Sequence, residues 1–343
     1  MIPHSRPWVT VADQQAVVAT LSGGSISQGA ITNYFEQEVA HLLSLCGGVA
    51  TSSGTSALEL ALRSLSIGPG DEVLIPNYAC DAVYHAVTNS AATPIICDVD
   101  ENGLLSPESV EARITGASAA IVAVHIFGLP ADIAGLNRFG LPVVEDACQS
   151  LGLNLDGGPA GGVGKVGVLS FHATKCITTA EGGMVVSNDR AILEQARNLR
   201  DGTASLQRPI TAPLSDLQAS LGQAQLQRHA SFLDRRTTIR KRYLAALANG
   251  GRFHTPIGAE SYLFRFVIRG EMDVQDAIHF FADRDIVARR GVDELLHRIL
   301  ALSDEDFPSS CGLYAGTISV PFYPGLTEDE VCKVETAIRE FAK

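Results

Sequence analysis

Short apolar segments alternate with amphipathic ones along the chain from about residue 50 onward. The apolar segments are rich in Val and Ile and show no polar face. This pattern predicts strands that are buried on both faces of a mainly parallel sheet. The predicted strands are Glu72–Ile75, Thr93–Cys97, Ala119–Val124, Pro142–Glu145, Val166–Phe171 and Gly183–Ser187.

Helical patterns separate many of these strands. In Thr55–Leu65 the apolar residues recur at helical spacing and form one stripe, which stops near Gly68. Pro107–Ile114 and Ala191–Leu199 follow the same pattern. The alternation of strands and helices predicts a layered α/β fold.

The pattern changes after about residue 215, where helices are longer and strands fewer. We therefore predict a large α/β/α domain over residues 1–225, with an N-terminal arm, and a smaller C-terminal α+β domain over residues 226–343. The elements predicted there are a helical region at Leu217–Ala248, a strand at Tyr262–Ile268, a helix at Val274–Ala282, a strand at Thr317–Val320 and a helix at Glu328–Phe341.

The composition excludes several classes of protein. The 343 residues include 26 Lys and Arg against 38 Asp and Glu, a net charge of −12, which disfavours nucleic-acid and anionic-membrane partners. Neither a secretory leader nor an apolar run long enough to span a membrane is visible. The seven cysteines are irregularly spaced without a CxxC pair, which predicts no metal site, reduced thiols and a cytoplasmic protein.

A Gly-rich stretch at residues 157–167 resembles a nucleotide-binding loop only superficially. A P-loop requires Gly five residues before its Gly-Lys pair and Ser or Thr after the Lys, but Pro159 and Val166 stand there. The stretch also precedes a predicted strand instead of a helix, so we interpret it as a turn-rich loop.

Three other segments carry candidate chemistry. The turn Thr51–Ser56 opens into a predicted helix, whose N-terminus could bind a phosphate or could simply be capped by Ser or Thr. Asp146 ends a predicted strand, where it could pair with a protonated ring nitrogen or cap a turn. Lys175 follows a strand among small neutral residues, where it could attack a carbonyl or be an ordinary surface lysine.

The order of these segments favours one cofactor. A phosphate turn, a strand-end Asp and a Ser-x-x-x-x-Lys segment (Ser170 to Lys175) match the phosphate, pyridine nitrogen and aldehyde of pyridoxal 5′-phosphate.

With these motifs the chain resembles the DegT-type nucleotide-sugar aminotransferases, which are fold-type-I pyridoxal-phosphate enzymes. The resemblance runs over nearly the full length. The strings that carry it most strongly are Ser53–Leu58, Val124–Asp132, Val144–Gln149, Ser170–Lys175 and Ala180–Gly183.

The resemblance implies roles for individual residues. Lys175 would form the aldimine with the cofactor and then shuttle a proton, and Asp146 would hold the pyridinium proton. Gln149 would lie beside the phenolic oxygen of the ring. Gly54, Thr55 and Ser170 would bind the phosphate. In a related dehydratase branch His replaces the lysine, so Lys175 favours amino transfer over dehydration.

Some positions depart from the family pattern. Cys80 stands where an aromatic residue usually stacks on the cofactor ring, and Thr211–Leu214 replaces a segment that can reach the phosphate of the neighbouring subunit. Arg289 and Arg290 replace a Tyr- or His-bearing stretch; they could bind a substrate carboxylate or phosphate, or form an exposed basic turn. His125 lies in a matching string and is a further candidate substrate residue.

The sequence thus predicts a pyridoxal-phosphate aminotransferase that moves an amino group from an amino acid, usually glutamate in the family, to a keto sugar carried on a nucleotide. The resemblance also implies a homodimer. Two alternatives stay open: a lyase or a transaminase acting on a non-sugar ketone, and a non-catalytic binding or regulatory protein with this fold. Cys80 and Thr211 motivate the second alternative, and the intact Lys175 segment argues against it.

Overall fold

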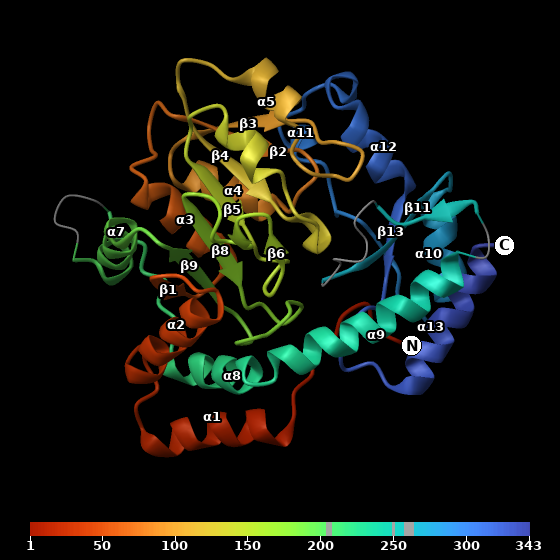
Figure 1. Cartoon of the computed structure of the whole chain (residues 1–343), viewed down its shortest axis with the longest axis horizontal. Helices are drawn as coiled ribbons and strands as arrows, with labels where there is room; N and C mark the ends of the chain where they lie inside the picture. The colour runs from red at the N-terminus through yellow and green to blue at the C-terminus, as the bar shows by residue number, and fades with distance from the viewer. Residues whose placement is uncertain (204–207, 249–250, 257–263) are drawn as a thin grey trace.

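The computed structural model describes residues 1–203, 208–248, 251–256 and 264–343. These residues form a large sheet and a smaller one, each covered by helices (Figure 1). The large sheet belongs to the N-terminal part of the chain and the small sheet to the C-terminal part. The predicted fold class, a large α/β/α layer structure with a smaller α+β part, is confirmed.

The large sheet has the strand order β1-β9-β8-β5-β4-β2-β3. Strands β8, β5, β4, β2 and β3 are parallel, whereas β9 is antiparallel to both β1 and β8. Two strands, β3 and β9, have the predicted bounds. The bounds are β1 (Gly47–Thr51), β2 (Glu72–Pro76), β3 (Thr93–Cys97), β4 (Ser118–Val124), β5 (Val143–Asp146), β8 (Val166–Ser170) and β9 (Gly183–Ser187).

Strand β1 was not predicted from the sequence. It begins with Gly47 and Gly48, which have no apolar side chain to mark a strand. The structure gives the reason for Gly48: a Cβ there would lie 2.6 Å from the sulfur of Met184 on β9. A side chain at position 48 would therefore displace Met184 from the buried contact between β1 and β9.

Side chains along the strands alternate between two helical layers. On β4, Val122 and Val124 pack with α3, α4 and α7, whereas Ile121 and Ala123 pack with α5 and α6. This explains why the strands are apolar throughout. The helices are α3 (Gly54–Ser64), α4 (Asp81–Asn89), α5 (Pro107–Arg113), α6 (Ile133–Asn137) and α7 (Arg190–Asp201).

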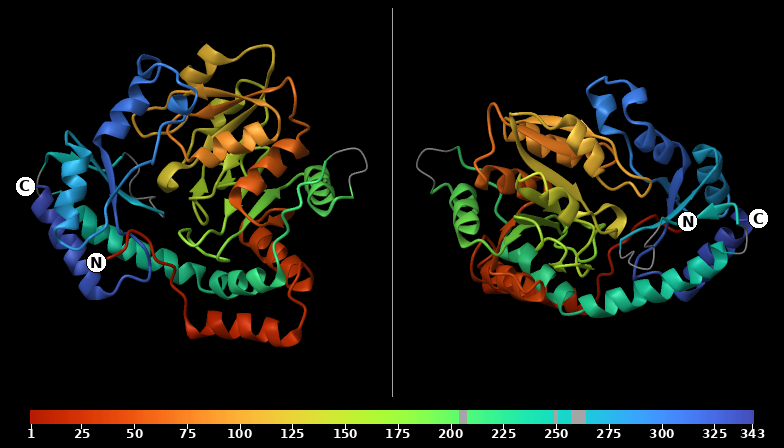
Figure 2. Two further views of the ribbon diagram at one scale, coloured as in Figure 1. Left: turned by 180° about the vertical axis from the view of Figure 1, so that it is seen from behind. Right: turned by 45° about the horizontal axis from the view of Figure 1, so that its top comes forward.

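Two helices near the N-terminus, α1 (Val11–Gly23) and α2 (Ala30–Leu42), were also not predicted. Both pack against α8 (Asp216–Leu226), as Figures 1 and 2 show. Apolar residues of α1 such as Val18 and Leu21 are more than half exposed, so its sequence does not mark a single buried face.

The small sheet has the order β10-β11-β13-β12 and is antiparallel throughout. Strand β13 and helices α10 and α13 have the predicted bounds. The strand predicted at Tyr262–Ile268 is β11, which begins at Phe266; residues 262 and 263 lie outside the described residues. The bounds are β10 (Phe253–His254), β11 (Phe266–Gly270), β12 (Arg289–Arg290), β13 (Thr317–Val320), α10 (Val274–Ala282) and α13 (Glu328–Phe341).

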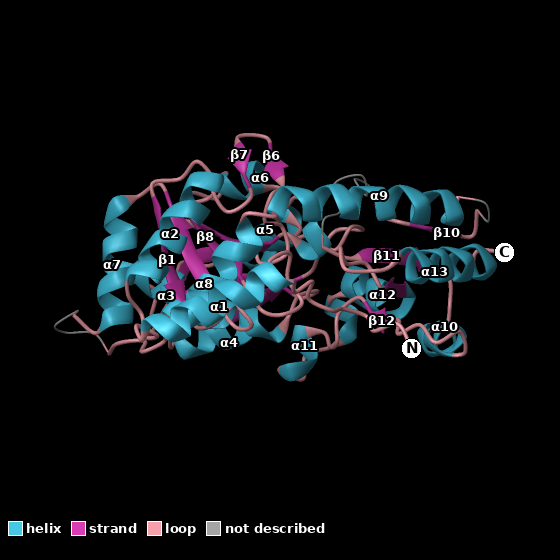
Figure 3. Ribbon diagram, turned by 90° about the horizontal axis from the view of Figure 1, so that it is seen from below, coloured by secondary structure: helices cyan, strands magenta, loops and turns pink. Residues whose placement is uncertain are grey.

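The helical region predicted at Leu217–Ala248 is two helices, α8 and α9 (His229–Leu247), that meet at Gln227 and Arg228. Helix α8 packs on α1 and α2, whereas α9 lies along α13 (Figure 3). We propose that the boundary between the two domains lies at this junction, close to the residue 225 predicted from the sequence.

The N-terminal arm reaches the small sheet. Ile2 forms a parallel bridge with Ile286, and the His4 ring lies 2.9 Å from the hydroxyl of Ser319 on β13. Both chain ends therefore lie on the C-terminal part of the molecule (Figure 2).

Short elements complete the described chain. They are η1 (Ile126–Gly128), β6 (Asn154–Leu155), β7 (Gly158–Pro159), α11 (Leu296–Ile299), η3 (Asp304–Asp306) and α12 (Pro308–Gly316). Among the described residues, the helices are too short or too polar for one of them to cross a membrane.

Candidate active site

Four of the predicted site residues lie at one edge of the large sheet. Asp146 ends β5 and Ser170 ends β8, and these parallel neighbours place their carboxyl ends side by side. Gly54 begins α3, which packs against β8 and β9. Lys175 lies in the loop that follows β8. The topology thus brings together groups that are separated by more than a hundred residues in sequence.

The N-terminus of α3 forms a small polar cradle. The hydroxyl of Ser53 accepts a hydrogen bond from the N–H of Ser56 at 3.0 Å and caps the helix. The N–H groups of Gly54 and Thr55 are in the first turn and have no partner within the helix. A Cβ on Gly54 would lie 3.2 Å from the hydroxyl oxygen of Ser170, so a side chain there would fill the cradle.

Gly183, the last residue of the Ala180–Gly183 segment, lies against this cradle. Gly183 begins β9 and pairs with Thr51 at the end of β1. A Cβ on Gly183 would collide with the carbonyl of Ser53 and would lie 2.8 Å from the N of Gly54. Glycine at position 183 therefore allows the phosphate turn to lie directly on the sheet.

The segment Thr211–Leu214 also lies beside the turn. The N–H of Ser52 donates to the carbonyl of Ala212 at 2.8 Å, and Thr51 bridges to Pro213. The segment therefore packs on the turn of its own chain.

Lys175 is half-buried, and its amine lies 4.9 Å from the ring centroid of Phe264. Its backbone N–H donates to the carbonyl of His172 at 2.9 Å, which fixes the loop. Asp146 is also half-buried, and its Oδ1 accepts the N–H of Cys148 at 3.0 Å. Both groups are thus held by backbone contacts and remain partly accessible.

Two thiols lie close to these charged groups. Burial raises the pKa of Cys148 well above its usual value, the Asp146 carboxylate raises it further, and the Lys175 ammonium opposes them. Cys80 is exposed as a residue, but the surrounding protein partly desolvates its sulfur, which raises the pKa of the thiol. The Lys175 ammonium again opposes this shift. Both thiols are therefore protonated at neutral pH.

Gln149 is held by the loop that follows β4. Its Oε1 accepts the N–H of Phe127 at 2.7 Å, where Phe127 has a left-handed φ of 59°. This bond fixes the orientation of the Gln149 amide.

The side chain of His125 lies inside the protein. It is fully buried; its Nδ1 accepts the N–H of Ala131 and its Nε2 lies 2.9 Å from a carboxylate oxygen of Glu145. Because Nδ1 accepts a hydrogen bond, Nε2 carries the proton and donates it to Glu145. Both ring nitrogens are engaged inside the protein, so the substrate role predicted for His125 has no support in its surroundings.

Glu145 is the centre of this buried network. The N–H groups of Gly161, Val163 and Gly164 donate to its carboxylate. Burial by itself would raise the pKa of Glu145, but the hydrogen bond from His125 and these N–H groups lower it below its usual value. The Gly-rich loop thus binds a carboxylate of the protein itself.

The predicted arginines of β12 differ in their surroundings. Arg290 donates to the carbonyl of Tyr314 at 3.0 Å and lies over its ring, so it is held within the small domain. Arg289 is exposed. Burial first, and then Arg265 and Arg289, lower the pKa of His4 to about 3, which indicates positive charge where the arm meets the small sheet. A substrate role for Arg289 stays a prediction.

Phe264 and Arg265 were not predicted from the sequence as site residues. Phe264 contacts Lys175, and the guanidinium of Arg265 lies 5.4 Å from the centroid of the same ring. The one available signal was an Arg inside the apolar run that predicted β11.

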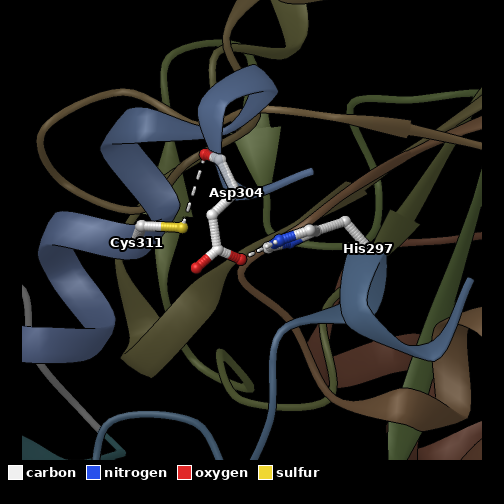
Figure 4. Close-up of side chains that lie close together, drawn as sticks. All are labelled: His297, Asp304 and Cys311. Atoms are coloured by element: carbon white, nitrogen blue, oxygen red, sulfur yellow. Dashed lines mark hydrogen bonds and ion pairs between the residues drawn. The ribbon is translucent and has the colours of Figure 1, made fainter. Parts of the chain in front are cut away.

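His297, Asp304 and Cys311 gather potential metal-binding atoms within 4.8 Å of one another (Figure 4). However, Arg298 binds both oxygens of Asp304, at 3.0 and 2.9 Å, and holds the pKa of that carboxyl well below its usual range. His297 also hydrogen-bonds Asn77, which precedes the Cys80 turn. We therefore interpret this cluster as an anchor for the turn.

The fold and the site together define an aminotransferase. The profile of the DegT/DnrJ/EryC1/StrS aminotransferase family matches residues 8–339. The chain belongs to this family of pyridoxal-phosphate-dependent enzymes, and the resemblance predicted from its motifs is confirmed.

Named relatives match this chain over all or nearly all of its length. The spore coat polysaccharide biosynthesis protein SpsC of Bacillus subtilis (strain 168) is 29% identical, over 100% of this chain and 97% of that protein. Spr1654 from Streptococcus pneumoniae in its PLP form is 26% identical, with a TM-score of 0.92, and the match covers 99% and 98% of the two chains. DesV from S. venezuelae is 29% identical, with a TM-score of 0.90 and coverage of 96% and 94%.

Proposed function

We propose that this aminotransferase moves an amino group from an amino acid, glutamate in the first instance, to a keto sugar linked to a nucleotide. The observation that carries the proposal is the convergence of four groups at one sheet edge: the Gly54–Thr55 turn, Ser170, Asp146 and Lys175. The name of SpsC, which refers to polysaccharide biosynthesis, supports a sugar as the acceptor.

The residues present fit pyridoxal phosphate. The cradle that a Cβ on Gly54 would fill suits a phosphate, which would receive the N–H groups of Gly54 and Thr55 and the hydroxyl of Ser170. The positive end of the α3 dipole favours this anion. The bound cofactor supplies a carbonyl for the amine of the donor and an electron-withdrawing ring.

Asp146 and Lys175 would act directly on the reaction. The Asp146 carboxylate would hold a proton on the ring nitrogen; each pKa unit by which it does so corresponds to about 1.4 kcal/mol. The amine of Lys175 would take the proton from the α-carbon of the donor, a general-base role that the half-buried position of this amine allows. Gln149, fixed by Phe127, would lie beside the ring.

We further propose a cytoplasmic homodimer. All seven cysteines are free thiols, which supports a reducing compartment. The exposed apolar side chains of α1 and α2, among them Val11 (64% exposed) and Tyr34 (56% exposed), support a second copy as the partner of this face.

The test is a transfer assay with L-glutamate and a panel of nucleotide-linked keto sugars, with 2-oxoglutarate and amino sugar measured together. We expect equal amounts of both products. Loss of a leaving group without 2-oxoglutarate would indicate a lyase, and transfer only to non-sugar ketones would indicate a different transaminase. Binding of the cofactor without turnover of any acceptor would indicate the regulatory alternative.

A further inference from the structure

Arg265 and the lysine of the candidate active site both lie against the ring of Phe264. The guanidinium carbon of Arg265 is 5.4 Å from the ring centroid of Phe264, and the amine of Lys175 is 4.9 Å from the same centroid. Helix α9 holds this arrangement, because Arg236 is buried and donates to the carbonyl of Phe264 at 3.0 Å. Arg265 and Thr174, the residue before Lys175, also line one small cleft.

The charge of Arg265 is left unpaired by the described part of the chain. Within those residues, no carboxylate lies within the 4.0 Å of an ion pair with its guanidinium. Burial lowers the pKa of Arg265, Asp293 opposes this shift, and the neighbouring Arg289 adds to it. An arginine stays charged under these conditions, and this half-buried charge has no carboxylate partner among the described residues. The position is therefore suited to an anion that a ligand supplies.

The guanidinium also lies toward the turn that carries Cys80. Cys80 interacts electrostatically with both Arg265 and Lys175. Tyr78, on the same turn, interacts with Arg265 as well. An anion bound by Arg265 would thus lie close to the aromatic ring that Lys175 also contacts.

We propose that Arg265 binds a carboxylate of the amino-acid donor and thereby determines that the donor is an amino acid instead of a simple amine. The inference rests on the proposed function. Guanidinium groups bind carboxylates through two parallel hydrogen bonds, and the α-carboxylate is bonded to the carbon that must reach Lys175.

The experiment compares Arg265→Gln and Arg265→Lys with the wild type and with Arg252→Gln. Arg252 is a matched control because its guanidinium also lies over an aromatic ring, that of Phe253, at 5.3 Å, but next to the short strand β10. Three quantities are measured on the cofactor-loaded protein: kcat/KM for L-glutamate, KM for the keto sugar, and the Kd of the non-reacting dicarboxylate glutarate by calorimetry. The visible spectrum of the cofactor checks that the site is intact.

We expect Arg265→Gln to lower kcat/KM for glutamate and to weaken glutarate binding, each by about 30-fold, as loss of a charge-assisted bidentate contact predicts. KM for the keto sugar should change less than about twofold, Arg265→Lys should be intermediate and Arg252→Gln should equal the wild type. Unchanged glutarate binding, or a rise only in KM for the keto sugar, would overturn the inference. If the wild type transfers no amino group, the proposed function fails, and glutarate binding still decides the role of Arg265.

Discussion

A Cβ added to Gly54 would lie only 3.0 Å from the Cβ of Ser170. The first residue of α3 and the last residue of β8 therefore form the two sides of one cradle. This contact joins the phosphate turn to the strand that leads to Lys175. The two motifs thus meet in the fold, although more than a hundred residues separate them in the sequence.

The cradle predicts the effect of Gly54→Ala. The added methyl group would occupy the space beside the hydroxyl of Ser170, and we expect the Kd for pyridoxal phosphate to rise about tenfold or more. An absorbance titration measures this Kd. Gly116→Ala is the control, because a Cβ there meets no heavy atom within 4 Å. Equal affinity of the two variants would mean that the cradle does not hold the phosphate.

The buried carboxylate of Glu145 predicts a loss of stability in Glu145→Gln. The new amide group would face N–H donors from the Gly-rich loop, and we expect a loss of about 3 kcal/mol in the free energy of unfolding. Denaturant unfolding measures it, with Glu111→Gln, an exposed residue paired to Arg138, as the control. A loss below about 0.5 kcal/mol would show that the network is dispensable.

The same carboxylate predicts a pH dependence. The pKa of Glu145 in the folded protein lies below the ordinary 4.5. Its contribution to the free energy of unfolding is therefore complete above pH 4.5 and is lost as the pH falls through the folded pKa. We therefore expect the wild type to lose stability more steeply than Glu145→Gln below about pH 4.5. Parallel acid unfolding curves would contradict this expectation.

His4 predicts a second pH effect, at higher pH. Its folded pKa is about 3, whereas the ordinary value is 6.5, so below pH 6.5 the unfolded chain binds a proton that the folded arm excludes. Stability should fall with decreasing pH in this range, by at most about 1.4 kcal/mol per pH unit. Melting temperatures at pH 7 and pH 5 should differ less in His4→Gln than in the wild type or in His85→Gln, an exposed control. An unchanged difference in His4→Gln would contradict this.

The exposed face of α1 and α2 predicts the effect of charge on assembly. Tyr34 and Leu42 lie on α2 and, together with Leu226, line a largely apolar hollow. We expect Tyr34→Glu with Leu42→Glu to convert the dimer to a monomer in light scattering. Leu302→Glu, at a position of 45% exposure in the small domain, should stay dimeric. A monomeric wild type would refute the proposed assembly.

Much of the fold followed from the apolar pattern. Strands β3, β9 and β13 were predicted with their bounds because compact apolar runs end at polar or glycine residues. Strand β1 and helix α1 were missed since glycines or exposed apolar residues obscure their pattern. The break between α8 and α9 was missed because no Gly or Pro marks Gln227 or Arg228.

The site was predictable only where topology determines it. Asp146, Ser170 and Lys175 end or follow neighbouring strands of a parallel sheet, so their meeting follows from the strand pattern. Arg265 comes from the small domain, and its approach to Lys175 depends on how the two sheets pack. The sequence motif around His125 suggested a substrate residue, but it does not indicate that the side chain is buried or that both ring nitrogens have partners inside the protein.

The most direct test of the central claim is the visible absorbance of the protein loaded with pyridoxal phosphate. The account predicts a protein-bound band that L-glutamate bleaches and that Lys175→Ala lacks. Lys165→Ala, an exposed lysine paired with Asp189 at the other end of β8, should behave as the wild type. A band that persists unchanged in Lys175→Ala and still responds to L-glutamate would contradict the account.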